Sequence, residues 1–234
     1  MRFRLLFILS LVLLSACAGH RTAPVKPDGS YTPSHLGKTD LDRVTEVHQQ
    51  EVFASLRLLA EKLYRRNPRE LRKSGQKSIE AGVARIFERH HAWQFEDLNY
   101  LRGTAAIQLA FREDYQGDRV LAYIVGLSSM IQSAFNDKTE FFVTDTVEPQ
   151  GLHNAARNIE IAVWRLSNAR NAKGELLLLS NEAADPAPNL SFEREFGKII
   201  ASLDVLSRVL SGRYGRTVVR AVQSLATAVF LPIR

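Results

Sequence analysis

Two clusters of ionisable side chains have the residue types that acid–base catalysis or metal binding would use. The denser cluster joins His90 and His91 with Glu88, Glu96 and Asp97, which lie close by in sequence. Imidazole and carboxylate groups are common metal ligands and common general acids or bases. Successive residues on a helix point about 100° apart, so both imidazoles reach one ion only where a helix has ended. A pair of surface histidines at a helix end is the simpler interpretation.

The second cluster is Glu113-Asp114, which is followed by Tyr115-Gln116-Gly117-Asp118. Two neighbouring carboxylates ahead of a helix could bind a cation or act as a paired acid and base. A turn followed by a capping residue accounts for the same pattern with fewer assumptions.

A third group of polar residues falls on one predicted helix. A buried polar network is one interpretation of this group, and a solvated helix face is the interpretation that we prefer. Its members are His153, Asn154, Arg157, Asn158, Glu160 and Arg165.

Motifs with a defined chemistry do not add to these clusters. The sequence contains no Gly-rich phosphate loop, nucleophile elbow, His-Glu-x-x-His motif or paired-cysteine metal motif. We therefore assign no catalytic, cofactor-binding or metal-binding residue, and we lean towards a non-enzymatic protein. The alternative is an enzyme or small-ligand-binding protein whose site is assembled from separated residues such as Glu113, Asp114, His90 and His91.

The single cysteine, Cys17, lies at the end of an apolar stretch. Arg2 and Arg4 form a short basic start, residues 5–14 are almost entirely apolar, and Ser15-Ala16 are small. This order is typical of an export signal that is cleaved. The uncharged stretch is shorter than the roughly 20 residues that a permanent transmembrane helix needs.

Leu14-Ser15-Ala16-Cys17 resembles the lipobox of bacterial lipoprotein precursors, a likeness that covers only the first 17 residues. The resemblance implies transfer of diacylglycerol to the Cys17 thiol, cleavage between Ala16 and Cys17, and acylation of the new amino terminus with chains such as palmitate. Ala18, in place of an aspartate, favours the outer membrane over the inner one, with the protein facing the periplasm. An ordinary secretory signal with a chance cysteine is the alternative.

The predicted organisation is a signal peptide at 1–16, a lipidated N-terminus and flexible tether at 17–38, and a helical domain at 39–234. The tether is rich in proline and glycine, and residues 18–38 would span at most about 70 Å when fully extended. With Cys17 lipidated no disulfide can form, so packing alone must hold the domain together.

Charge is distributed unevenly within a total of +6. Residues 57–89 carry about +6, residues 90–204 about −6, and residues 205–234 about +5. The basic segments could meet anionic phospholipid headgroups beside the anchor, although solubilising surface charge is the simpler interpretation. We expect no nucleic-acid partner, since no basic-aromatic recognition motif is present.

Apolar periodicity predicts an all-α fold, an irregular multi-helix bundle. Residues 120–136 carry no charge and predict a central buried helix, while Phe141-Phe142-Val143 could be a strand or a loop. The predicted helices start at or near Thr39, Pro68, Ile79, Phe95, Val120, Pro149, Ser191 and Thr217.

These expectations combine into a membrane-anchored periplasmic lipoprotein without an assigned cofactor. We expect it to act as a non-enzymatic interaction or scaffold protein of the bacterial envelope. Its partners would be the membrane, through the lipid on Cys17, and an envelope protein or anionic lipid.

Overall fold

The computed structural model describes residues 37–88, 92–181, 189–219, 225 and 227–233. The predicted signal peptide, Cys17, most of the predicted tether, and His90 and His91 lie outside these residues.

The described part of the chain is all-α, as the sequence predicts, and contains seven α-helices, one short 3-10 helix and no β-strand. Phe141, Phe142 and Val143, which could have formed a strand, lie in a loop. The elements are α2 (Asp40–Arg66), α3 (Pro68–Lys73), α4 (Ile79–Phe87), η2 (Glu96–Leu98), α5 (Gly103–Ala110), α6 (Arg119–Ala134), α7 (Pro149–Asn168) and α8 (Ser191–Tyr214).

Local capping chemistry sets where the main helices begin. The Thr39 hydroxyl accepts a hydrogen bond from the Asp42 amide, and the Asp42 carboxylate accepts one from the Thr39 amide. This reciprocal pair satisfies two amides that have no partner within α2. Pro68 and Pro149 each occupy the first position of a helix, where the missing amide hydrogen costs nothing. The predicted starts of α2, α3 and α7 are therefore confirmed.

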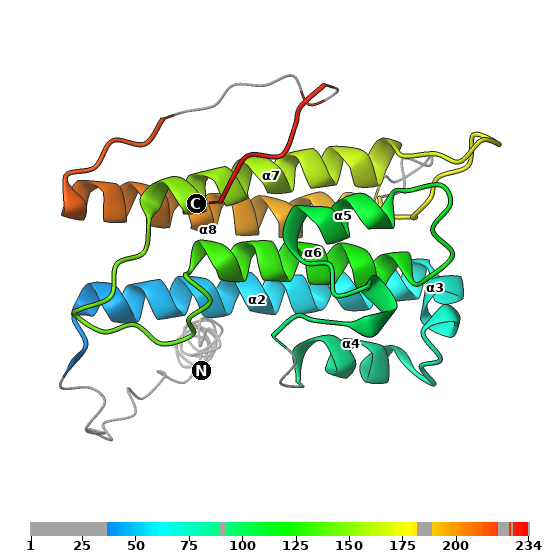
Figure 1. Cartoon of the computed structure of the whole chain (residues 1–234), viewed down its shortest axis with the longest axis horizontal. Coiled ribbons are helices and arrows are strands. Elements are labelled where there is room, and N and C mark those ends of the chain that lie inside the picture. Colours follow the sequence, from blue (N-terminus) through cyan, green and yellow to red (C-terminus); the bar gives the residue numbers. More distant parts are fainter. Residues whose placement is uncertain (1–36, 89–91, 182–188, 220–224, 226, 234) are drawn as a thin grey trace, which may run out of the picture. The chain divides into compact units, whose positions relative to one another are not determined.

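Helix α6 forms the centre of the bundle. Of its 16 residues, 15 are buried, and it contacts α2, α5 and α7 (Figure 1). Gly126 allows α5 to approach closely, because a Cβ there would lie 2.6 Å from the Ile107 amide nitrogen. The prediction of a central buried helix is confirmed. Among the described residues, no helix combines the length and the apolar character needed to cross a bilayer.

The prediction of a helix that starts near Phe95 is wrong over the first half of that helix. Asn99 and Tyr100 both have positive φ values, 50° and 59°, which a right-handed helix cannot contain. The chain instead makes one 3-10 turn, reverses, and begins α5 at Gly103. The apolar pattern of the segment is satisfied by burial of Phe95, just before the 3-10 turn, and of Leu98, at its end.

A second predicted helix, residues 217–231, is not present in the described part of the chain. Gly215 ends α8 in the left-handed conformation, with φ at 62°. The residues described after it are not helical. Residues 227–233 lie across α7 instead, as the red trace of Figure 1 shows. Asn158 of α7 donates to the Leu231 carbonyl at 2.8 Å and accepts from the Leu231 amide at 2.6 Å, so it satisfies backbone groups that a helix would have paired internally.

Candidate functional site

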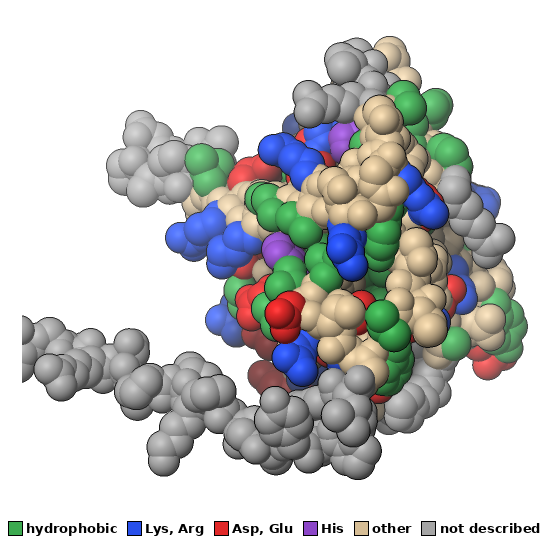
Figure 2. Space-filling model, turned by 90° about the vertical axis from the view of Figure 1, so that its left-hand side faces the viewer, with side chains coloured by type: hydrophobic (Ala, Val, Ile, Leu, Met, Phe, Trp, Pro, Cys, Tyr) green, Lys and Arg blue, Asp and Glu red, His purple; other side chains and the backbone are tan. Residues whose placement is uncertain are grey.

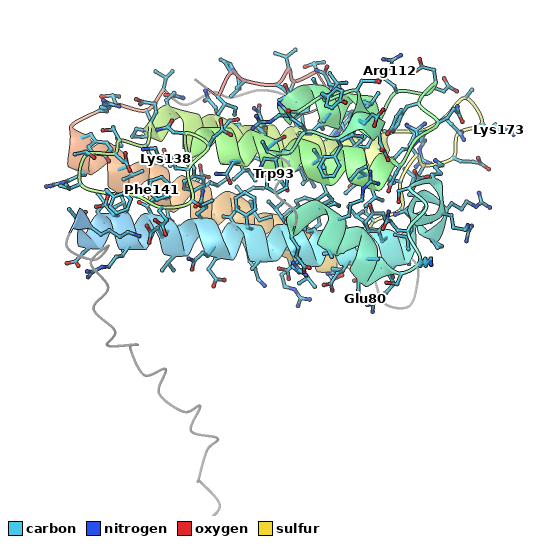
Figure 3. The ribbon with its side chains drawn as sticks, turned by 60° about the horizontal axis from the view of Figure 1, so that its bottom comes forward. Glu80, Trp93, Arg112, Lys138, Phe141 and Lys173 are labelled. Carbon is cyan, nitrogen blue, oxygen red and sulfur yellow. The ribbon has the colours of Figure 1, made fainter. Side chains whose placement is uncertain are left out.

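The carboxylates that the sequence offered as an acid–base pair do not form a site. The Asp114 carboxylate pairs with the exposed Arg112 guanidinium, and this hydrogen bond lowers the pKa of Asp114. The Glu113 carboxylate accepts a hydrogen bond from the Ala172 amide at 2.8 Å. Figure 3 shows Arg112 and Lys173 at the periphery of the domain. These groups tie loops together on the surface.

His90 and His91 lie outside the described residues, so a metal site can be sought only among the residues that the structure describes. Among them, no group of three or more His, Cys, Asp or Glu side chains has the arrangement of a metal site. Glu96 lies in the short helix η2, and Asp97 forms an ion pair with Arg85 at 3.0 Å.

The polar residues of α7 are arranged differently from our preferred prediction of a solvated face. Asn154 is 7% exposed and Asn158 is fully buried. Helix α7 therefore carries a buried polar network, which was the other interpretation. Its polar residues serve two neighbouring structures, a cavity against α8 and the extended C-terminal segment.

A cavity of about 590 Å³ opens between α7, α8 and residues 216–218. Helices α7 and α8 pack side by side along their lengths (Figure 1). The cavity lies where the first half of α7 meets the last half of α8. Its lining residues are His153, Arg157, Asp204, Ser207, Arg208, Ser211, Gly212, Arg216, Thr217 and Val218.

The inner wall of this cavity is an ordered ion-pair network. The Asp204 carboxylate accepts a hydrogen bond from Arg157 at 2.6 Å and lies 3.4 Å from His153 Nδ1. Arg157 also pairs with Glu160 at 3.0 Å. Burial raises the pKa of Glu160, although Arg157 opposes that effect. The network fixes the Arg157 guanidinium towards the cavity with few degrees of freedom.

Two further arginines form the rim. Arg208 is exposed and forms no ion pair with the other residues that the structure describes. Arg216 pairs with Glu148 at the start of α7. Figure 2 views this end of the domain and shows Lys and Arg side chains spread over it. Three arginines and one carboxylate thus line the cavity. Arg157 and Arg216 are paired with carboxylates, so Arg208 is the lining arginine that has no ion pair among the described residues.

The chemistry available in this cavity is anion binding. Guanidinium groups donate pairs of parallel hydrogen bonds that match phosphate and carboxylate oxygens. The hydroxyl of Ser207, one of the residues that line the cavity, donates to the Pro149 carbonyl at 2.7 Å. The carboxylate of Asp204 lies between His153 and Arg157 and pairs with both.

A second pocket, of about 420 Å³, has aromatic walls. Trp93 stacks on Phe53 with ring centroids 5.8 Å apart and meets Phe87 edge-on at 6.0 Å. Gln49 and Gln132 both donate to the Lys138 carbonyl at 2.7 Å, which fixes the polar side of this pocket. Figure 3 shows Trp93 beside α2. Such a pocket suits a small, largely apolar group with a polar edge.

Sequence reasoning missed both the cavity and the pocket. The spacing of His153, Arg157 and Glu160 at intervals of four and three was visible and places them on one face of α7. The partner of that face is Asp204, which lies 47 residues beyond Arg157. No local signal connects the two.

Comparison with known proteins places no constraint on the site. No protein family model, no curated protein and no solved structure matches the chain.

Proposed function

We propose that the protein is a lipid-anchored, non-enzymatic protein of the bacterial envelope that binds the phosphate of an anionic phospholipid headgroup in the α7–α8 cavity. The observation that carries the binding proposal is the convergence of Arg157, Arg208 and Arg216 on one cavity with a single lining carboxylate. The lipobox resemblance around Cys17 carries the proposal of anchoring.

The two halves of this proposal reinforce each other physically. One acyl chain holds a protein on a membrane only marginally, and two or three hold it stably. A domain tethered in this way meets headgroups at high local concentration, so a weak phosphate site is occupied. Each well-placed cation near an anionic surface adds about 1 kcal/mol.

Vesicle flotation tests the binding half. The chain without residues 1–17, which carry the apolar export signal and the predicted lipid, is expected to float with phosphatidylglycerol vesicles and not with phosphatidylcholine vesicles. Replacing Arg208 and Arg216 together with alanine is expected to abolish flotation. The matched control is Arg69→Ala with Arg72→Ala on α3, which removes the same charge from exposed positions away from the cavity. Equal losses for both double variants would reduce the effect to net charge and contradict a specific site.

Metabolic labelling tests the anchoring half. Wild-type protein is expected to incorporate labelled palmitate and to fractionate with the outer membrane, whereas Cys17→Ser is expected to do neither. Lipid incorporation into the Cys17→Ser variant would refute lipidation at this residue.

A second candidate function, binding of a small apolar ligand, is favoured by the aromatic pocket around Trp93. The chain has two tryptophans, so Trp164→Phe leaves Trp93 as the only indole reporter. We expect a neutral apolar probe to shift its emission. Replacing Phe53 with alanine should weaken this response. If the emission spectrum does not change at a probe concentration that saturates a control hydrophobic protein, the pocket does not bind the probe.

A further inference from the structure

Four valines on the surface of α2 and α8 are open to solvent although they are apolar. Val44 and Val47 of α2 are 42% and 56% exposed, and Val205 and Val209 of α8 are 47% and 45% exposed. A single exposed valine needs no explanation, whereas a contiguous apolar patch marks an interaction surface. We call these four side chains the valine face.

Two contacts between the helices bring the two halves of the valine face together. Nδ1 of His48 lies 2.7 Å from the Ser202 hydroxyl, and Lys62 donates to the Ser191 carbonyl at 2.9 Å. The helices are therefore antiparallel, and the turn of α2 ahead of His48 meets the turns of α8 that follow Ser202. Each of these stretches carries two of the valines. Residues 202, 205 and 209 recur at intervals of three and four, so both α8 valines share the side of the helix that meets α2.

Arginines flank the α8 part of the valine face. Arg208 and Arg213 are exposed, and neither forms an ion pair with another residue of the described chain. Because successive helical residues point about 100° apart, Arg208 lies on one side of the two α8 valines and Arg213 on the other. Residues 205–216 contain no acidic side chain. An apolar strip between cations is typical of a helix that lies in the interface of an anionic membrane.

Charges on α2 set the extent of the face. Arg43 pairs with Asp40 at 3.4 Å, so the first turn adds no net charge. The exposed Glu51 lies one turn beyond Val47. An anionic surface would therefore meet only the first two turns of α2, which carry both of its valines.

The valine face lies at the end of the domain where the preceding chain enters. Figure 1 shows the first turn of α2 and the last turn of α8 at the same end. Lys38 fixes the entry, because its ammonium pairs with Glu46 at 2.6 Å and lies 5.1 Å from the centroid of the Phe142 ring. A lipid on Cys17 would hold this end within the reach of residues 18–38, at most about 70 Å, of a bilayer.

We propose that the valine face docks the domain on an anionic phospholipid bilayer, with the four valines in the interfacial region and Arg208 and Arg213 at the phosphates. The inference rests on the proposed function and deepens it, since Arg208 also lines the α7–α8 cavity and docking would bring that cavity to the headgroups. A bilayer is the partner that the anchor supplies, and its charge complements the two arginines. A second copy of the chain would instead bring the same arginines to the contact, which like-charge repulsion opposes.

Fluorescent reporters test insertion directly. Cys17 is the only cysteine, so the chain without residues 1–17 accepts one label at a chosen position. This truncation removes none of the described helices, which all begin after residue 37. The fluorophore NBD on Val47→Cys or Val205→Cys is expected to shift to the blue with phosphatidylglycerol vesicles and to be quenched by doxyl groups on the acyl chains. Leu190→Cys, at the opposite end of α8, is the control and should do neither.

Two results with these reporters would overturn the proposal. One is the absence of a shift and of quenching at both valine positions in excess vesicles. The other is a shift without vesicles that grows with protein concentration, which would assign the face to a second copy.

Serine variants test the apolar contribution without changing charge. Val47→Ser with Val205→Ser should weaken vesicle binding by about tenfold, because exposed apolar area is lost. The matched control is Leu179→Ser with Leu190→Ser, whose side chains are 44% and 58% exposed beside the end of α2 and the start of α8. The control should bind like the wild type, and equal losses for both double variants would contradict a docking face.

Glycerol phosphate separates this inference from the headgroup site. The valines do not line the α7–α8 cavity, so the Val47/Val205 serine variant should bind glycerol phosphate like the wild type. Reporters that insert in a protein that binds no glycerol phosphate would refute the cavity proposal and leave the docking face. Glycerol phosphate binding without insertion would refute the docking face alone.

Discussion

Two buried polar regions of this domain differ in what surrounds them. At the α3–α6 junction the Arg119 guanidinium donates to the carbonyls of Ala110, Arg112 and Tyr115 at 2.7 to 2.8 Å. Its own amide donates to Glu70 at 2.8 Å. On α7, by contrast, His153 and Arg157 line a cavity of about 590 Å³. In the first region the hydrogen-bond donors are satisfied by acceptors of the fold itself, whereas the second region has donors that lie beside open space.

The difference indicates which polar residues are structural and which are available to a ligand. A buried group whose bonds all end within the fold contributes to stability, and its loss leaves partners unsatisfied. A group beside a cavity can exchange water for a ligand at little cost to the fold. Substitutions at the α3–α6 junction should therefore change stability, and substitutions at the α7 cavity should change binding.

The largest expected effect is at Arg119. Arg119→Met leaves three inward carbonyls without their donor and should lower the free energy of unfolding by about 3 to 5 kcal/mol, measured by urea denaturation. The control is Arg112→Ala, which removes an exposed guanidinium paired with Asp114 and should leave the denaturation midpoint unchanged. Similar midpoints for the two variants would erase the contrast between the regions.

The next effect concerns pH and Asp118, which caps α6 and accepts a hydrogen bond from Tyr64 at 2.9 Å. Burial raises the pKa of Asp118 from 3.8 to about 6. The folded protein thus holds this proton more tightly than the unfolded chain. Stability from this group is present at pH 4 and is lost as the pH rises through 6, by about 3 kcal/mol at neutral pH.

Asp118→Asn tests this sign, since asparagine keeps the capping oxygen and cannot ionise. Between pH 4 and pH 7 the wild type should lose stability relative to the variant, as measured by urea denaturation at each pH. Parallel pH profiles for the two proteins would show that Asp118 titrates normally in the fold.

A smaller effect distinguishes two glycines within helices. Gly151→Ala should destabilise the protein by about 1 to 3 kcal/mol, because the added methyl group meets the Ile233 carbonyl. Gly197→Ala should stabilise it by up to about 1 kcal/mol, because alanine favours a helix where space is open. Thermal unfolding of both variants measures the contrast. Stabilisation by both substitutions would mean that the extended segment does not lie on α7.

The smallest effect on stability is expected at the cavity rim. Arg208→Ala should change the free energy of unfolding by less than about 0.5 kcal/mol, because the side chain is exposed. Binding of glycerol phosphate, followed by calorimetry, should weaken by about fivefold, which corresponds to about 1 kcal/mol. A rim arginine that altered stability and left phosphate affinity unchanged would reverse the assignment of the two regions.

Local signals explain how much of the fold the sequence predicts. The capping bonds of Thr39 and Asp118 and the position of Pro68 act within one turn of their own helix, so these effects do not depend on distant residues. The prediction of a helix over 217–231 is wrong at the residues of that range that the structure describes, because apolar content alone does not select a helix. There the amides of Asn154 and Asn158, more than 70 residues away, offered the backbone other partners.

The sequence by itself determined the helical class, the main helix starts and the burial of α6, because capping residues and the absence of charge are properties of neighbouring positions. It also carries the lipobox resemblance at Cys17, which remains a prediction. Only the tertiary structure decided that α7 is polar on the inside, that Asp204 orients Arg157, and that residues 228–233 lie extended on α7. Those outcomes depend on pairing groups from distant segments, and no spacing along the chain encodes which distant group will arrive.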